Sequence, residues 1–558
     1  MRQRFWSVVL VWVWLAAAVA TSAQAPLATG SISGRVTVRG EPSPLPVRRA
    51  RVTLDGGGTR AVTDTDTDGR YQFAGLQAGS YHVTAEKSGY VTLTAGATRP
   101  FVRPAPTALK NGEAITLDIA LPRGAALEGR LADGSGEPLE NVLVAAVRLV
   151  TTSQGRRPTV VAQDWTDDLG RFRVHSLPAG AFLLEAGFPS TLSMGVTAIP
   201  GKPVEGLART YYPGTASVSD AQPVRVGVGE ERTSLDFEMQ RVPVSRLTLR
   251  VVDTTGKPPS TTGCRVQPVG GPFRLDAGPY VPQRGNVCEF HALPPGDYWV
   301  MGAARLSPGG SAAYAVSRIT ASGDDLGEMV LRVERSADIA GTIEPDEPDV
   351  WEHPPTVRVL THAVAYDLPS PDGLLDGLMA RANDAATTTA GPDGRFSLAS
   401  VFGPTVFRLA GLPPGWALSA VWLDDQEVTD RAADLSATEK TRRLKMIVTN
   451  RTGRLAGTIA RQDREPLAPD ARVVVFAADE SRWAAPSRFV AVAVPESNGR
   501  FSLEGLLPAS YLVAVADDLD DDFWQDPEVL RRLTGRATLV TLAAGDSMTV
   551  ALTTGGLR

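Results

Sequence analysis

One phrase recurs five times along the chain and limits the fold more than any other feature of the sequence. In the first copy it reads Gly69-Arg-Tyr-Gln-Phe-Ala-Gly-Leu76-Gln-Ala-Gly-Ser-Tyr81, and it starts again at Gly170, Asn286, Gly394 and Gly499. The starts are 101, 116, 108 and 105 residues apart, a period that is typical of domains and too long for a solenoid repeat. The 558 residues are therefore expected to form five similar domains in series.

The phrase predicts two β-strands joined by a corner. Tyr71 and Phe73, and then Tyr81 and Val83, alternate with polar residues, which is the pattern of strands with one buried face. A strand that contains glycine precedes most copies, as at Gly34, and another alternating strand ends each copy. About seven short strands in ~100 residues favour an all-β fold of tandem Greek-key β-sandwiches, immunoglobulin-like or transthyretin-like. The best helical candidate runs from Pro527 to Leu533, with Asp526 as its N-cap.

The N-terminus has the pattern of an export signal. Arg2 and Arg4 precede an apolar run from Phe5 to Ala20, and small residues follow. We assign residues 1–25 to a signal peptide, with cleavage expected after Ala23, and expect no transmembrane span in the mature chain. The protein is then exported to the periplasm, the outer cell surface or the extracellular space. The expected domains are 26–122, 123–241, 242–336, a divergent fourth at 337–449, and 450–558.

Composition and motifs argue against several functions. The net charge of −6 provides no basic surface for nucleic acid. The chain has five histidines and neither an H-E-x-x-H nor a G-x-S-x-G motif. We therefore expect no enzyme, no catalytic residues, no cofactor and no metal site. The tract from Asp64 to Gly69 resembles the start of a calcium loop but lacks the closing glutamate, so a hairpin turn is favoured. The acidic run from Asp517 to Asp522 is read as a solvated loop, with weak calcium binding as the alternative.

Two groups of residues are singled out as candidate sites. Cys264 and Cys288 are the two cysteines, and both fall on expected strands of one repeat. A disulfide that stabilises the domain is favoured over a pair of buried thiols, because an exported protein reaches an oxidising compartment. The aromatic residues Tyr211, Tyr212, Phe523 and Trp524 are the candidate binding surface. The alternative is that these rings cover their own sandwich or a domain junction.

The series Gly-x-Val, Asp-Gly69-Arg-Tyr71-x-Phe73 and Leu76-x-x-Gly79-x-Tyr81-x-Val83, closed by Ser88-Gly89-Tyr90, resembles the carboxypeptidase regulatory-like domain. The resemblance implies a transthyretin-like β-sandwich of the kind found in large exported bacterial proteins built of such modules. It fixes a fold and not a function. We expect a non-enzymatic scaffold that binds a protein or polysaccharide at the cell envelope or outside the cell. The alternative is a carbohydrate-binding protein that uses exposed aromatic residues, by analogy with starch-binding modules of related fold.

Overall fold

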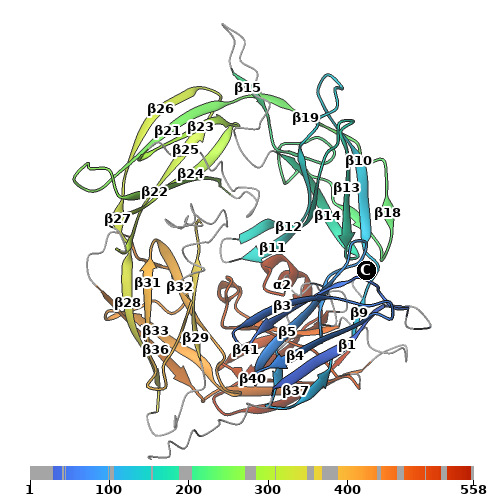
Figure 1. The fold of residues 1–558 in the computed structure, drawn as a ribbon. Coiled ribbons are helices and arrows are strands. Elements are labelled where there is room, and N and C mark those ends of the chain that lie inside the picture. The colour runs from blue at the N-terminus through green and yellow to red at the C-terminus, as the bar shows by residue number, and fades with distance from the viewer. Residues whose placement is uncertain are drawn as a thin grey trace, which may run out of the picture. The chain divides into compact units, whose positions relative to one another are not determined.

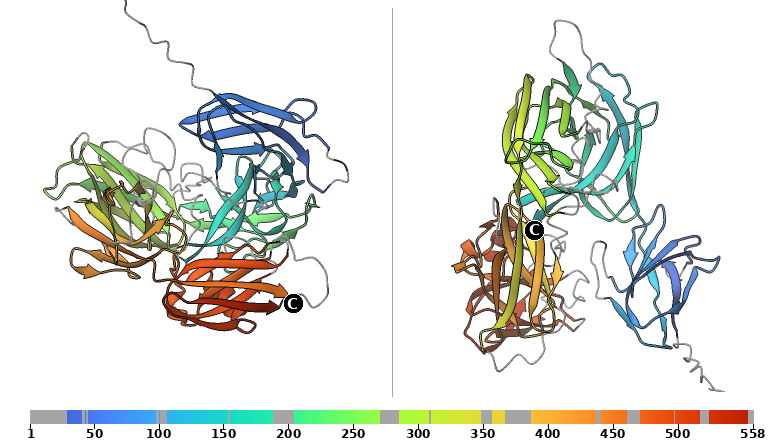
Figure 2. Two further views of the ribbon diagram at one scale, coloured as in Figure 1. Left: turned by 90° about the horizontal axis from the view of Figure 1, so that it is seen from below. Right: turned by 60° about the vertical axis from the view of Figure 1, so that its left-hand side comes forward.

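The computed structural model describes residues 29–553, apart from gaps at 41–42, 44, 98–99, 101–105, 153–154, 188–203, 270–284, 308–309, 348–356, 367–386, 437–440, 461–470, 497 and 517–523. The described residues form an all-β chain of tandem β-sandwiches, with one α-helix (Figures 1 and 2). They fall into two compact units, the first sandwich and the rest of the chain. Within the described residues no helix has the length and apolar character needed to cross a membrane.

The first two sandwiches each pair a sheet built on the glycine-containing strand with a larger second sheet. Sandwich 1 joins β4 (Arg70–Leu76), β1 (Gly30–Val38), β8 (Ala114–Thr116) and β9 (Ile119–Leu121) to a sheet of β3 (Thr59–Asp64), β2 (Arg51–Gly56), β5 (Gly79–Glu86), β6 (Leu93–Thr94) and β7 (Thr107–Leu109). Sandwich 2 joins β13 (Arg171–Leu177), β10 (Ala125–Asp133), β18 (Glu231–Arg232) and β19 (Phe237–Met239) to β12 (Gly155–Trp165), β11 (Leu143–Thr152), β14 (Gly180–Gly187), β16 (Thr210–Tyr211) and β17 (Val224–Val226). A short pair, β15 (Glu205–Leu207) and β20 (Arg241–Pro243), follows.

The remaining sandwiches repeat this plan. Sandwich 3 has β23 (Val287–Leu293), β21 (Ser245–Val252) and β26 (Asp325–Arg332) against β22 (Thr261–Pro268), β24 (Gly296–Arg305), β25 (Ala312–Ala321) and β27 (Glu334–Arg335). Sandwich 4 has β31 (Arg395–Val401), β28 (Ala337–Pro345), β36 (Arg442–Thr449), β33 (Ala417–Leu423) and β34 (Gln426–Glu427) against β30 (Thr388–Thr389), β29 (Arg358–Ala363), β32 (Pro404–Ala410) and β35 (Ala433–Asp434). Sandwich 5 has β40 (Arg500–Leu506), β37 (Gly453–Ala460) and β43 (Ser547–Thr553) against β39 (Val490–Ala493), β38 (Arg472–Ala477), β41 (Ala509–Ala516) and β42 (Thr538–Leu542).

The recurring phrase places one strand in each sheet of its sandwich. In sandwich 5, β40 pairs with β37 while β41 pairs with β38, so the corner between them crosses from one sheet to the other. The tyrosine after the corner closes it, because its hydroxyl donates to the carbonyl four residues earlier. The distances are 2.8 Å from Tyr81 to Gln77, 2.8 Å from Tyr298 to Pro294 and 2.7 Å from Tyr511 to Leu507. The predicted order of turn, strand, corner and strand is confirmed.

The glycine of the preceding strand allows the last strand of the sandwich to approach. In sandwich 5, Gly457 lies between Phe501 of the antiparallel β40 and Val550 of the parallel β43. A Cβ atom on Gly34, Gly129 or Gly457 would lie 1.9, 2.3 or 2.4 Å from a carbonyl oxygen of that last segment. A larger side chain would therefore push the parallel segment off the sheet.

The buried side chains form a separate core between the two sheets of each sandwich. In sandwich 2 the core includes Leu127, Val144, Phe172 and Leu184, all at most 3% exposed. Sandwich 5 has a second cluster outside its sheets. There α2 (Pro527–Thr534) and Trp483, which follows the 3-10 helix η3 (Glu480–Arg482), pack with Val474 and Phe476. Asp526 caps α2 by accepting the backbone N–H of Glu528, as the sequence predicts.

Candidate functional site

The two cysteines form a disulfide in the core of sandwich 3. Cys264 lies on β22 and Cys288 on β23, with their Cα atoms 6.3 Å apart. These strands belong to opposite sheets, so the bond connects the two layers of the sandwich. Cys288 is 2% exposed and packs among core residues such as Val266 and Leu331. This position suits a stabilising role and offers no accessible thiol.

Three of the four aromatic residues of the predicted binding surface lie in the described part of the chain. Tyr211 is 3% exposed because β16 pairs with β14 at the edge of its sheet. Tyr212 packs on the core of sandwich 2, with its ring perpendicular to that of Phe237 at a centroid distance of 6.0 Å. Trp524 packs against the α2 cluster of sandwich 5, and Phe523 lies outside the described residues. Tyr211, which pairs with Glu185, leaves little of its ring exposed to a partner, and the candidate binding surface stays a prediction.

The aspartate tract of the first sandwich forms a hydrogen-bonded turn. The carboxylate of Asp66 accepts the backbone N–H groups of Asp68 at 2.9 Å and Arg70 at 2.7 Å. These bonds fix the turn that starts β4. The turn is not the predicted hairpin, because β3 and β4 belong to different sheets. Across the described ranges, no group of three His, Cys, Asp or Glu side chains is arranged to hold a metal ion. The tract from Asp517 to Asp522 lies outside those ranges.

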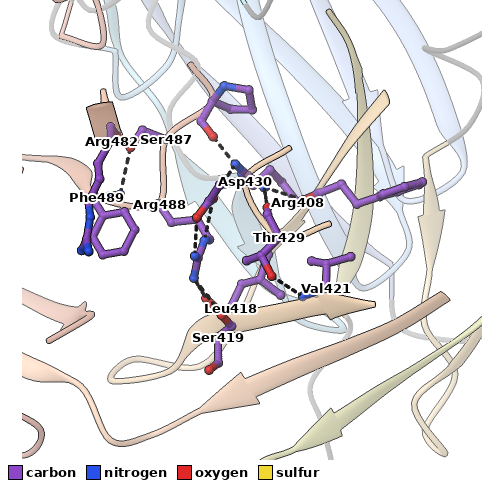
Figure 3. Close-up of polar contacts among 12 residues, drawn as sticks. Arg408, Leu418, Ser419, Val421, Thr429, Asp430, Arg482, Ser487, Arg488 and Phe489 are labelled. Atoms are coloured by element: carbon purple, nitrogen blue, oxygen red, sulfur yellow. Dashed lines mark hydrogen bonds and ion pairs between the residues drawn. The ribbon is translucent and has the colours of Figure 1, made fainter. Parts of the chain in front are cut away.

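The most elaborate polar cluster of the described chain connects sandwiches 4 and 5 (Figure 3). Arg488, just before β39 of sandwich 5, reaches Asp430 of sandwich 4 with two nitrogens, at 2.6 and 3.0 Å. Its third nitrogen donates to the carbonyls of Leu418 at 2.7 Å and Ser419 at 3.0 Å. The guanidinium group thus satisfies a carboxylate and two backbone acceptors of the neighbouring sandwich at once.

A second arginine makes the reciprocal contact. Arg408, on β32 of sandwich 4, donates to the carbonyl of Pro486 in sandwich 5 at 2.8 Å. It also donates to the carbonyl of Thr429 at 2.8 Å and to Asp430 at 3.2 Å. Asp430 therefore lies between two arginines that come from different sandwiches (Figure 3).

Burial and charge act against each other in this cluster. The side chains of Arg408 and Arg488 are 11% and 12% exposed, whereas that of Asp430 is 48% exposed. Burial lowers the pKa of Arg408 to about 10, with Asp430 opposing the shift and Arg488 adding to it. Burial acts to raise the pKa of Asp430, but the hydrogen bond and charge of Arg488, helped by Arg408, outweigh it and lower the pKa. Arg408 and Asp430 are therefore both charged at neutral pH.

Close backbone contacts accompany the arginine cluster. The hydroxyl of Thr452, between β36 and β37, donates to the carbonyl of Gly415 at 2.6 Å. Gly505 of sandwich 5 has a positive φ of 76°, and a Cβ atom there would lie 3.0 Å from the carbonyl oxygen of Trp416 in sandwich 4. The two sandwiches are thus in direct contact, and the segment between β36 and β37 spans only 450–452.

The junction between sandwiches 3 and 4 is apolar. Tyr314 of β25 packs on Phe402 at a centroid distance of 5.4 Å, and Trp299 of β24 packs on Tyr366 at 5.2 Å. Burial, helped by the charge of Asp434, raises the pKa of Tyr366 to about 12, so its phenol stays neutral. Two junctions of different chemistry therefore connect three consecutive sandwiches.

An open groove of about 780 Å³ lies on the outer face of the five-stranded sheet of sandwich 4. Paired residues cross this sheet in one row, Glu427, Trp422, Lys445, Thr342 and Arg395. The ring of Trp422 is 36% exposed. Asp424 at the groove accepts the backbone N–H of Arg443 at 2.8 Å and pairs with Arg442, and these contacts outweigh burial and lower its pKa.

Sequence reasoning missed both the arginine cluster and the groove. Arg488 and Asp430 are 58 residues apart in different sandwiches, and each appears in an ordinary polar segment. No local pattern marks such a pair. Trp422 lies on β33, in the extra hairpin of the fourth repeat, and the divergence of that repeat from the recurring phrase is the signal that could have directed attention there.

Comparison with known families finds a match for the first sandwich. The model of the carboxypeptidase regulatory-like domain matches residues 31–122. No curated protein matches the chain. Similar solved structures include the Bacillus anthracis TIE protein (9% identity, 76% of this chain and 73% of that chain, TM-score 0.16). A streptococcal ancillary pilin (13%, 55% and 99%, 0.18) and the minor pilin GBS52 of Streptococcus agalactiae (13%, 38% and 97%, 0.19) are also similar.

These TM-scores are too low to relate the function or domain arrangement of those proteins to this chain. The family match covers one sandwich, and the recurring phrase extends the same strand order to the others. The chain is therefore a tandem array of β-sandwiches, and residues 31–122, in the first of them, match the model of the carboxypeptidase regulatory-like domain.

Proposed function

We propose that the chain is a non-enzymatic scaffold, exported to the cell envelope or the extracellular space, that presents its modules in a fixed order to a protein partner. The proposed modules are 26–122, 123–241, 242–336, 337–449 and 450–558, preceded by a signal peptide cleaved after Ala23. Modules joined by short segments and by direct contacts keep their spacing, which a scaffold needs and a flexible tether lacks.

The junction between sandwiches 4 and 5 carries this proposal. Two arginines, each about nine-tenths buried, bind the same carboxylate. If either arginine moved to another partner, the backbone carbonyls to which it donates would lose their hydrogen bonds. Breaking such contacts leaves buried polar groups unsatisfied, which costs about 1–3 kcal/mol per group. The relative orientation of the two sandwiches is therefore strongly preferred over others.

Distances between two spin labels on the mature chain, measured by double electron–electron resonance, test the proposal. Ser397→Cys on sandwich 4 and Val494→Cys on sandwich 5 place labels at exposed positions. A control pair, Val494→Cys with Arg500→Cys, stays within sandwich 5 and gives the width due to the labels alone. We expect one distance peak of similar width in both pairs. A distribution several times broader between the sandwiches would refute the fixed scaffold.

The groove on sandwich 4 favours a second candidate function, binding of a polysaccharide. Trp422 presents an exposed ring above a row of hydrogen-bonding side chains, and aromatic rings with convergent polar groups are the usual components of a ligand site. Arg443 and Asp425, which also line the groove, are exposed and available to bind hydroxyl groups.

Retention of the mature chain on a panel of insoluble polysaccharides tests this candidate. We expect Trp422→Ala to reduce retention at least tenfold. Trp165→Ala, at a ring that is 50% exposed on sandwich 2, serves as the control and should leave retention unchanged. Equal retention of the two variants, or no retention of the unmodified chain, would contradict it.

A further inference from the structure

In each sandwich one late strand pairs parallel with the first strand, which is β1, β10, β21, β28 or β37. In every sandwich except the fourth, no described strand pairs with the other edge of this late strand, where unpaired backbone groups attract further strands. The five sandwiches can therefore be compared for how each one protects this edge.

Sandwiches 1 and 2 interrupt the strand with a carboxylate. Asp118 separates β8 from β9 and accepts the backbone N–H of Arg35 at 2.8 Å. Asp236 separates β18 from β19 and accepts the backbone N–H of Arg130 at 2.8 Å. Each carboxylate replaces a backbone acceptor in the ladder and leaves strands of only two or three residues.

Sandwiches 3 and 4 use other means. In β26, Gly327 has a φ of 68° at a break in the register, and Glu328 pairs with Arg250 across the sheet at 2.7 Å. Charges and an irregular backbone both discourage another strand from adding to the edge. In sandwich 4 the equivalent strand β36 is covered by β33, which pairs with it antiparallel from Ala417 to Leu423.

The edge strand β43 of sandwich 5 has none of these protections among the described residues. Its seven residues, Ser-Met-Thr-Val-Ala-Leu-Thr, pair with β37 without a register shift, and none is charged. Gly457 meets the carbonyl of Val550 as Gly34 meets that of Leu117, so Ala551 stands where sandwich 1 has Asp118. No described strand pairs with the outer side of β43.

The pattern of β43 is symmetric about Val550. Met548 and Leu552 are on the core side at equal distances from it, with exposures of 36% and 4%. Thr549 and Ala551 are both exposed. In an antiparallel pair of two such strands centred on Val550, Met548 of one copy lies opposite Leu552 of the other, and Thr549 lies opposite Ala551. Apolar residues then meet apolar ones, and no like charges face each other.

The backbone hydrogen bonds have the phase that this pairing needs. The N–H of Arg454 donates to the carbonyl of Asp546 at 2.8 Å, which sets the parallel ladder between β37 and β43. In that ladder the backbone groups of Thr549 and Ala551 are directed away from β37. These two residues are the ones that would exchange hydrogen bonds with a second copy.

We propose that β43 is a self-association edge, at which two copies of this chain pair antiparallel and form one continuous sheet across a two-fold axis. The contact is isologous, so it closes as a dimer and does not propagate. Sandwich 4 shows the same arrangement within one chain, where β33 completes the sheet next to β36. The inference does not rest on the proposed scaffold function, and either one can fail without the other.

Sedimentation velocity of the mature chain over a concentration series tests the proposal. The variant Ala551→Asp places a charged side chain on the exposed edge, at the position where sandwich 1 has Asp118. We expect the unmodified chain to dimerise with rising concentration and Ala551→Asp to remain monomeric over the same range. Circular dichroism confirms that the variant is folded.

A matched control places the same charge on the edge that is already protected. Val330→Asp lies on β26 of sandwich 3, at a side chain that is 48% exposed. We expect this variant to dimerise like the unmodified chain. A second edge variant, Thr549→Lys, should abolish the dimer through a different charge. A chain that is monomeric at all concentrations, or a dimer that persists in Ala551→Asp and Thr549→Lys, would overturn the proposal.

Discussion

Replacing Arg488 with alanine should uncouple sandwiches 4 and 5. The change removes the two-nitrogen contact with Asp430 and the bonds to the carbonyls of Leu418 and Ser419. The ion pair contributes about 1 kcal/mol, since Asp430 is half exposed. The two unpaired carbonyls add about 1 kcal/mol each. We therefore expect the free energy of local opening at the junction to fall by about 3 kcal/mol, or roughly a hundredfold in the opening equilibrium.

Hydrogen exchange of the mature chain, followed by mass spectrometry, measures this change directly. Peptides that contain β33 and β39 should lose about a hundredfold in protection, whereas peptides from β10 and β13 of sandwich 2 should not change. Arg500→Ala is the matched control, because Arg500 is exposed on β40 away from the cluster. Less than a threefold loss in Arg488→Ala, or an equal loss in Arg500→Ala, would refute the reasoning.

Three further predictions concern other parts of the chain. The pKa of Asp430 is lowered in the folded state, so its contribution to stability is present above the unfolded value of about 4 and is lost as the pH falls through the folded pKa; thermal unfolding between pH 7 and 3 should show a smaller decline in Asp430→Asn. Gly341→Ala would place a Cβ atom 2.1 Å from the ring of Phe396, so it should destabilise sandwich 4 by about 1–3 kcal/mol in calorimetry, while Ser397→Ala changes little. Removing the disulfide with Cys264→Ala and Cys288→Ala should lower the stability of sandwich 3 by about 3 kcal/mol, given its sequence separation of 24, and an unchanged calorimetric transition would contradict that role.

The strands were predictable because their signal is local. Alternation at Tyr71 and Phe73, or at Tyr81 and Val83, follows directly from one buried and one exposed face. The helix from Pro527 was predictable for the same reason, since its cap and first turn are neighbours in sequence.

The candidate site was not predictable, because it depends on contacts between distant segments. Tyr211 was predicted to be part of a binding surface, yet it lies on β16, which pairs with β14, and is buried. Arg408 and Arg488 acquire their role only when two sandwiches meet at Asp430. A sequence pattern predicts which face of a strand is buried, but it does not predict which residues of a neighbouring module will contact that strand.

The parallel pairing of the first and last strands also determines how a module responds to force. In sandwich 4 the chain enters through β28 and leaves through β36, and these strands pair continuously from Ile339 with Arg442 to Pro345 with Val448. Sandwich 5 has the same arrangement from Arg454 with Ser547 to Ala460 with Thr553. Tension between the two ends of a module therefore shears the ladder lengthwise, and its hydrogen bonds must break together and not one after another. The force that such a module withstands therefore depends on the free-energy barrier to its unfolding. This property suits a protein that is anchored at one end and pulled at the other.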